Sequence, residues 1–168
     1  MSSISKPKET LSASKKALQS LGLLFNALGT SSWTATAPKH LSAKQQLHFT
    51  KIAKLASHTK AANSWFTENN LRFCFSAWAK TLSDASINQW LSPYTLKARL
   101  PVNVPKQVAV IMAGNIPLVG LHDCLSVLIS GHNLIAKNSR LLLDEPKDLH
   151  SQFSAVQLQS DSLFPWTS

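Results

Sequence analysis

Two short polar clusters carry the residue types in this sequence that can bind a ligand or stabilise developing charge. The first is Gly114-Asn115, which offers backbone N–H groups and a side-chain amide. The second covers residues 137–140, Lys-Asn-Ser-Arg, and offers two cations and two smaller polar side chains. Both clusters follow apolar runs, at 108–113 and 134–136. This placement is the main reason to expect a site in the chain.

The apolar runs on either side of these clusters predict a β-α-β unit. The run from Val108 to Ala113 is short and β-branched, which predicts a strand buried on both faces. From Leu118 to Ser130 the apolar residues recur at the spacing of one helical face. Pro117 suits the first turn of that helix, and Gly131 suits a left-handed cap just past its end. We therefore expect two parallel strands joined by a helix near 117–130.

Ligands of open α/β sheets bind beyond the carboxyl ends of the strands, which is where both polar clusters are expected to lie. Spacing alone favours a simpler interpretation. In that interpretation Gly114-Asn115 is only a tight turn, and Lys137-Asn138 is only a solvated strand end.

Composition places the chain among globular proteins, with 44% hydrophobic residues. No apolar run approaches the roughly 18 residues of a membrane span, and the basic, Ser-rich N-terminus lacks the apolar segment of a signal peptide. Cys74 and Cys124 lack metal-ligand spacing, and each is interpreted as a small core residue in a reducing compartment. The six histidines are scattered, so no metal site is assigned. A cytoplasmic location is expected.

The net charge of +9 is concentrated in the first third of the chain. Residues 1–60 contain nine lysines and the single acid Glu9, whereas residues 61–168 contain eight basic and seven acidic residues. Such asymmetry can mark an arm that binds nucleic acid or a membrane surface. However, the lysines are dispersed, no arginine is present in this third, and aromatic residues are not interleaved with the lysines. A solvated helical surface is therefore favoured, with no specific nucleic-acid partner.

Helical periodicity dominates the sequence before the β-α-β unit. Helices are predicted at 11–28 and 41–57. A third helix is predicted to start after the cap Thr67, with Glu68 in its first turn, and a fourth is predicted to be capped by Ser83-Asp84. Their inward faces are predicted to contain Leu18, Leu21, Phe25 and Leu28; Leu41, Phe49, Ile52 and Leu55; Leu71, Cys74, Phe75, Trp78 and Leu82; and Ile87, Trp90 and Leu91. We predict a helical region at 1–95, the start of a dinucleotide-binding α/β domain at 96–140, and a divergent or truncated tail at 141–168.

Several segments between about residues 60 and 140 together resemble the acyl-CoA reductase family. They are Ala61 to Asn69, Trp78-Ala79, Trp90-Leu91 with Tyr94, and above all Ile111 to Asp123 with Ser130-Gly131-His132. The family includes the fatty-acid reductase component of bacterial luminescence and belongs to the aldehyde dehydrogenase superfamily. The resemblance implies an α/β fold in which a helical N-terminal layer precedes the first β-α-β unit of a parallel Rossmann-like sheet, aldehyde dehydrogenase-like but incomplete.

The same resemblance implies a reductase that converts a long-chain acyl-CoA, an acyl thioester, to an aldehyde with NADPH. Asn115, after Gly114, matches the asparagine whose amide donates to the thiohemiacetal oxyanion of the superfamily. Lys137 matches a lysine that contacts the adenosine ribose, in a motif that continues through Ser139. Arg140 stands where NAD-preferring members carry a glutamate, and an arginine there suits a 2′-phosphate.

This sequence departs from the family pattern at the nucleophile. The catalytic cysteine of the family belongs to a separate domain, and neither Cys74 nor Cys124 occupies its position. We therefore expect an N-terminal fragment that is inactive alone. Its expected partners are the acyl-CoA substrate of the intact enzyme and either a missing catalytic domain or further copies in an oligomer. Two alternatives stay open: a standalone nucleotide-binding or protein-interaction module, and a basic binder of nucleic acid or membrane surfaces through residues 1–60.

Overall fold

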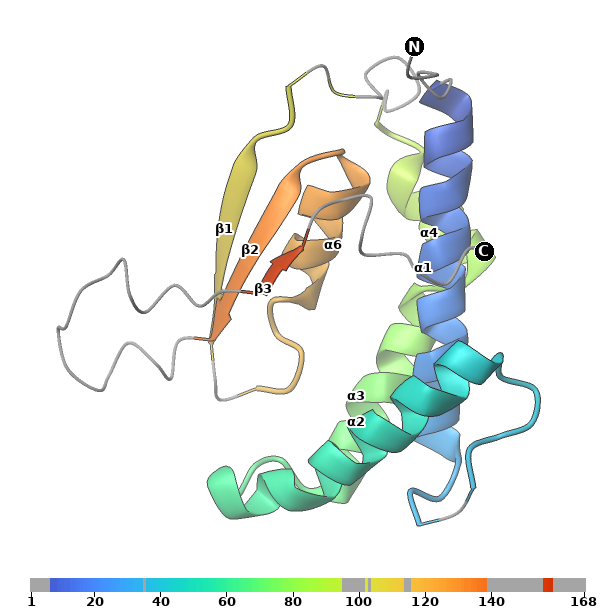
Figure 1. Ribbon diagram of the computed structural model, residues 1–168, viewed down its shortest axis with the longest axis vertical. Coiled ribbons are helices and arrows are strands. Elements are labelled where there is room, and N and C mark those ends of the chain that lie inside the picture. Colours follow the sequence, from blue (N-terminus) through green and yellow to red (C-terminus); the bar gives the residue numbers. More distant parts are fainter. Residues whose placement is uncertain are drawn as a thin grey trace, which may run out of the picture. The chain divides into compact units, whose positions relative to one another are not determined.

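The computed structural model describes residues 7–34, 36–94, 102, 104–113, 116–138 and 156–158 (Figure 1). The described residues divide into two units. A helical unit comprises residues 15–94, and an α/β unit comprises the residues from 102 onward together with residues 7–14. The prediction of a mixed α/β chain is therefore confirmed at the level of fold class.

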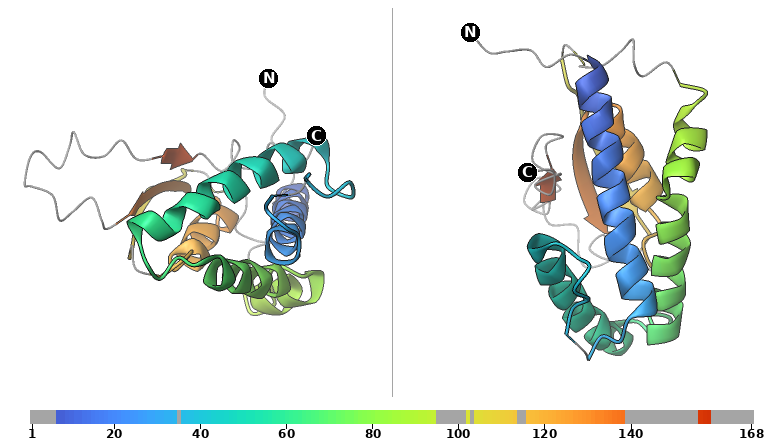
Figure 2. Two further views of the ribbon diagram at one scale, coloured as in Figure 1. Left: turned by 90° about the horizontal axis from the view of Figure 1, so that it is seen from below. Right: turned by 90° about the vertical axis from the view of Figure 1, so that its right-hand side faces the viewer.

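Within the described residues, four helices precede the sheet, and two of them begin at the caps predicted from the sequence (Figures 1 and 2). They are α1 (Pro7–Thr30), α2 (Ala43–Ala62), α3 (Glu68–Thr81) and α4 (Asp84–Leu91). The Thr67 hydroxyl accepts a hydrogen bond from the Asn70 backbone N–H at 3.2 Å, and Ser83 caps α4 in the same way. Because each hydroxyl satisfies an N–H that the helix itself leaves unpaired, the sequence could place both helix starts.

Apolar side chains of α1, α3 and α4 form the core of the helical unit. Their buried residues include Leu18, Leu24, Phe25 and Leu28 of α1, Leu71 and Phe75 of α3, and Ile87 and Leu91 of α4, together with Leu82 between α3 and α4. The rings of Phe25 and Phe75 lie 5.4 Å apart. A Cβ at Gly29 of α1 would stand 3.0 Å from the backbone nitrogen of Ser76, so glycine allows α1 to approach α3 closely. Trp78 and Trp90 are only half-buried.

The inward face of α2 differs from the predicted one. Leu55 was expected to face the core but is 70% exposed. The residues that are buried are Gln45, Phe49, Ala53 and Ala56. Gln45 completes a capping box with Ser42, and its side-chain amide also donates to the Ser20 carbonyl at 2.9 Å. Phe49 is inward as predicted, but a polar residue and two alanines complete the packed face, and a search for large apolar residues overlooks them.

The predicted β-α-β unit is present and its strands are parallel. It consists of β1 (Gln107–Met112), α6 (Leu121–Ile129) and β2 (Asn133–Asn138), and β1 pairs directly with β2. Gly131 has φ 82°, and it ends α6 as predicted. Its N–H bonds the Leu128 carbonyl at 3.0 Å, while the His132 N–H bonds the Val127 carbonyl at 3.2 Å. These two bonds satisfy the last carbonyls of the helix.

The start of α6 corrects the predicted boundary. The helix begins at Leu121, so Pro117 lies in a preceding turn and not in the first helical turn. Leu118 has φ 56°, a left-handed conformation that a right-handed helix cannot contain. The apolar spacing that begins at Leu118 therefore extends beyond the helix that it predicts.

The sheet also differs from the prediction of a parallel sheet buried on both faces. Residues of β1 alternate between exposed and half-buried, and Ile111 is 59% exposed. In the described part of the chain, α6 covers the face that carries Val110, Met112 and Leu134. A third strand, β3 (Val156–Leu158), pairs antiparallel with β2, giving the order β1-β2-β3. The sheet is therefore mixed, and one face of β1 is open.

Candidate functional site

The carboxyl ends of β1 and β2 lie side by side at one edge of the sheet. Lys137 is in register with Ile111, and Asn138 is in register with Met112, the last residue of β1. The polar end of β2 thus lies next to the strand after which the sequence continues to Gly114-Asn115. Of the predicted site residues, the structure describes Lys137. Gly114, Asn115, Ser139 and Arg140 lie outside the described residues, so their roles stay predictions.

Lys137 is buried, with 6% of its surface exposed, although it stands near the end of its strand. The simpler interpretation of Lys137 as part of a solvated strand end is therefore wrong. Because side chains alternate along a strand, Lys137 lies on the face opposite Leu134 and Ala136, which pack against α6. An ammonium group that leaves water needs polar partners, so this position differs from the exposed lysines of the chain.

The turn at 116–120 packs tightly against the end of β1. A Cβ at Gly120 would stand 2.9 Å from the Met112 Sδ atom and 3.0 Å from its Cβ atom. A larger residue at position 120 would therefore require the Met112 side chain to move or the turn to shift. Leu118, within the same turn, holds a strained left-handed φ of 56°. The segment that follows Asn115 is therefore packed closely against the end of β1, in addition to the hydrogen bonds within the turn itself.

Neither cysteine has the properties of an activated nucleophile. Cys124 is buried in α6, and its Sγ atom lies 3.9 Å from the Met112 Sδ atom. Burial raises the pKa of the Cys124 thiol, and the charge of Asp123 raises it further. Burial also raises the pKa of the half-buried Cys74 thiol. Since the thiolate is the reactive form, both environments suppress reactivity, as expected for small core residues.

His132 has a structural position at the opposite edge of the sheet. Its Nδ1 atom accepts a hydrogen bond from the Lys106 backbone N–H at 3.3 Å, just before β1 begins. The Asn133 N–H bonds the Lys106 carbonyl at 2.9 Å beside it. His132 therefore joins the amino ends of β1 and β2, away from the carboxyl edge where the polar clusters converge.

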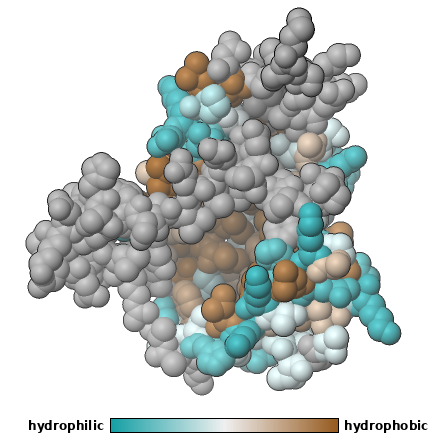
Figure 3. Space-filling model, viewed as in Figure 1, coloured by the Kyte–Doolittle hydropathy of each residue, from teal (hydrophilic) through white to brown (hydrophobic). Residues whose placement is uncertain are grey.

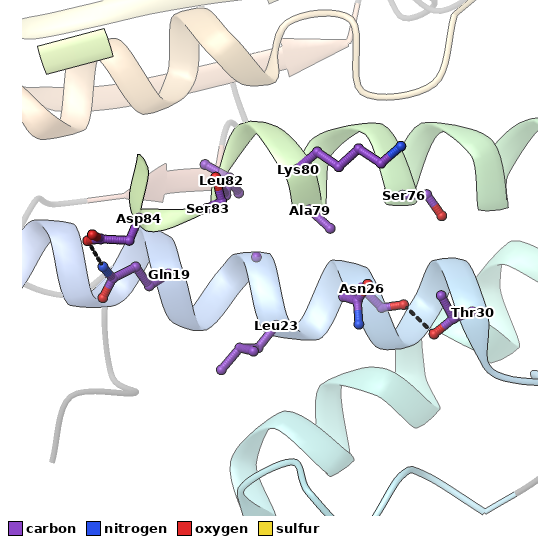
Figure 4. A pocket seen from close by; sticks show the side chains of 11 residues that line it. Gln19, Leu23, Asn26, Thr30, Ser76, Ala79, Lys80, Leu82, Ser83 and Asp84 are labelled. Atoms are coloured by element: carbon purple, nitrogen blue, oxygen red, sulfur yellow. Dashed lines mark hydrogen bonds between the residues drawn. The ribbon is translucent and has the colours of Figure 1, made fainter. Parts of the chain in front are cut away.

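A second concave region lies within the helical unit, between α1 and the α3–α4 corner (Figure 4). This groove has a volume of about 620 Å³, and its lining includes Gly22, Leu23 and Ala79. Gln19 donates to Asp84 across it at 2.6 Å. The sequence analysis did not predict the groove. The available signal was the pair of glycines in α1, because a glycine lets a neighbouring helix come close at its own position and leaves more space between the helices elsewhere.

The part of the chain that the structure describes contains no group of three or more His, Cys, Asp or Glu residues that could hold a metal ion. No helix within that part is long and apolar enough to cross a membrane. The chain matches no family model, no curated protein and no solved structure. The functional interpretation therefore depends on the residues and their geometry.

Proposed function

We propose that this chain is the N-terminal portion of an NADPH-dependent acyl-CoA reductase, and that the carboxyl edge of β1 and β2 contributes to its nucleotide and thioester site. The observation that carries the proposal is the parallel register, which brings the buried Lys137 beside the end of β1. Nucleotides bind at this edge of open α/β sheets. The specific sequence block from Ile111 to Asp123 connects this geometry to the reductase family.

In this proposal three of the polar residues have defined tasks. Lys137 donates hydrogen bonds to a ribose of the nucleotide, and its burial favours a fixed ammonium position. Arg140 pairs with the 2′-phosphate, because its planar guanidinium can donate two parallel hydrogen bonds to phosphate oxygens. Asn115 donates from its amide to the oxyanion that forms when a thiolate attacks the thioester. NADPH, when bound, supplies the hydride.

Neither cysteine of the chain has an environment suited to attack on the thioester. Burial raises the pKa of both thiols, and Cys124 packs against Met112 inside the core of the α/β unit. We therefore expect the purified chain to bind nucleotide without reducing acyl-CoA, measured as the loss of NADPH absorbance. In an enzyme that adds the catalytic cysteine to this segment, Asn115→Ala should lower turnover about 100- to 1,000-fold with little change in KM.

Nucleotide binding to the chain itself tests the proposal. The probes are adenosine 2′,5′-bisphosphate and ADP, titrated while the backbone amide signals of β1 and β2 are followed by NMR. The bisphosphate should bind more tightly and perturb the carboxyl ends of the strands. Arg140→Glu should remove this preference, and Lys137→Met should weaken the binding of both probes.

Lys106→Met is the matched control, because Lys106 is exposed and precedes the amino end of β1. It should leave both affinities within about twofold, as surface substitutions usually do. Equal losses in Lys106→Met and Lys137→Met would indicate non-specific attraction to a basic protein. The absence of any perturbation at the strand ends would overturn the proposal.

A further inference from the structure

The outward side of α2 combines cationic and apolar side chains. Lys44, Lys51 and Lys54 are exposed, and Leu47 and Leu55 are 54% and 70% exposed. Their spacings of three, four and seven residues place them on one side of the helix. We name these five residues the lysine–leucine face. Figure 3 shows α2 as a hydrophilic surface interrupted by hydrophobic residues.

No acidic side chain on α2 offsets the charge of this face. The sequence from Thr10 to Thr67 contains no aspartate or glutamate. The half-buried His48 lies on the same side of the helix, and its pKa is lowered by burial and by the positive charge of Lys51. The lysine–leucine face therefore presents a positive surface that includes two large apolar side chains.

The opposite side of α2 is fixed to the helical unit. Phe49 and Ala53 are buried, and the Gln45 amide donates to the Ser20 carbonyl of α1 at 2.9 Å. The capping box of Ser42 and Gln45 fixes the first turn. The lysine–leucine face is consequently held outward, and a partner that binds it does not have to order the helix first.

We propose that the lysine–leucine face docks the protein on an anionic lipid surface. Each lysine held close to such a surface strengthens binding about fivefold, and leucine side chains gain by leaving water for the boundary of the acyl chains. A nucleic-acid backbone would attract the lysines but offers no apolar layer for Leu47 and Leu55. The face also has no arginine or aromatic residue to read or stack on bases. The leucines thus favour a lipid surface.

Vesicle sedimentation tests this proposal independently of nucleotide binding. The full chain is mixed with phosphatidylcholine vesicles, with and without an equal part of phosphatidylserine. It should sediment with the anionic vesicles and be released as salt increases. Lys51→Glu with Lys54→Glu should weaken binding about 25-fold or more, because two attractive charges are lost. Leu47→Ser with Leu55→Ser should also weaken binding to the anionic vesicles.

Lys80→Glu is the matched control, since Lys80 is exposed on α3 in the same unit. It should weaken binding less than fivefold. All substituted positions are exposed, and unchanged circular dichroism confirms that the variants are folded. The proposal is overturned if the full chain does not sediment with anionic vesicles, or if the leucine variant binds them as the parent does. It is also overturned if Lys80→Glu weakens binding to anionic vesicles as much as the double lysine variant does. The same holds if duplex DNA competes fully with the vesicles and its binding depends on the same lysines.

Discussion

Replacing Gly120 with alanine should loosen the candidate site without removing any polar group. The added Cβ would stand 2.9 Å from the Met112 Sδ atom and 3.0 Å from its Cβ atom, so the Met112 side chain must move or the turn must shift. Overpacking of this kind costs about 1–3 kcal/mol. Alanine also restricts the unfolded chain, which offsets about 0.4–1 kcal/mol. The expected net destabilisation of the α/β unit is therefore about 1–2 kcal/mol.

Hydrogen exchange of the β1 and β2 backbone amides is the appropriate assay, because it reports the stability of the α/β unit separately from that of the helical unit. A loss of about 1–2 kcal/mol accelerates exchange through opening of the unit about 5- to 30-fold. In the double variant with Met112→Ala, the Cγ and Sδ atoms that crowd the new Cβ are absent. The two substitutions should therefore be less destabilising together than their sum, by at least about 0.5 kcal/mol.

Val119→Ala is the control for this experiment, because Val119 lies in the same turn and is 42% exposed. It should change stability by less than about 0.5 kcal/mol. If Gly120→Ala exchanged no faster than this control, or if its effect and that of Met112→Ala were additive, the tight packing of the turn against β1 would be refuted.

Three further predictions concern stability and thiol chemistry. Gln45→Leu removes the side-chain half of the capping box and the hydrogen bond to α1, so it should lower the stability of the helical unit by about 2–3 kcal/mol. An unchanged urea midpoint, followed by tryptophan fluorescence, would contradict this. Gly131→Ala places a Cβ at φ 82° and should destabilise the α/β unit by about 1–2 kcal/mol, measured by the same amide exchange; exchange as slow as in the parent would refute the cap. Because burial raises the pKa of Cys74 and Cys124, both should react with a disulfide reagent more slowly than a free cysteine peptide at neutral pH. The unfolded thiols ionise first, so stability should also fall as pH rises through the ordinary thiol pKa and toward the raised one; rapid labelling at neutral pH would argue against buried thiols.

Local signals in the sequence predicted the elements that depend on neighbouring residues. Thr67 and Ser83 mark helix starts because each hydroxyl bonds an N–H within its own helix. Gly131 marks a helix end because its φ of 82° is unfavourable for other residues. The capping box of Ser42 and Gln45 is also a local motif that the sequence contains, although we did not predict it.

Periodicity shows which residues share a face of a helix or strand, but not what that face contacts. The tertiary structure decides those contacts. Leu55 has helical spacing yet is exposed, because α2 packs through Gln45, Phe49, Ala53 and Ala56. Ile111 is exposed for a similar reason, since α6 covers the other face of β1 in the described part of the chain. The antiparallel β3 depends on pairing between distant residues, which no local pattern contains.

The candidate site shows the same division between sequence and structure. The sequence by itself placed Gly114-Asn115 and Lys137 after two apolar runs, because a β-α-β pattern is local. The pairing of Lys137 with Ile111 and the burial of its side chain required the strands to meet in one register. A lysine at a strand end is ordinarily solvated, and only the surrounding fold makes this one a buried cation at the carboxyl edge.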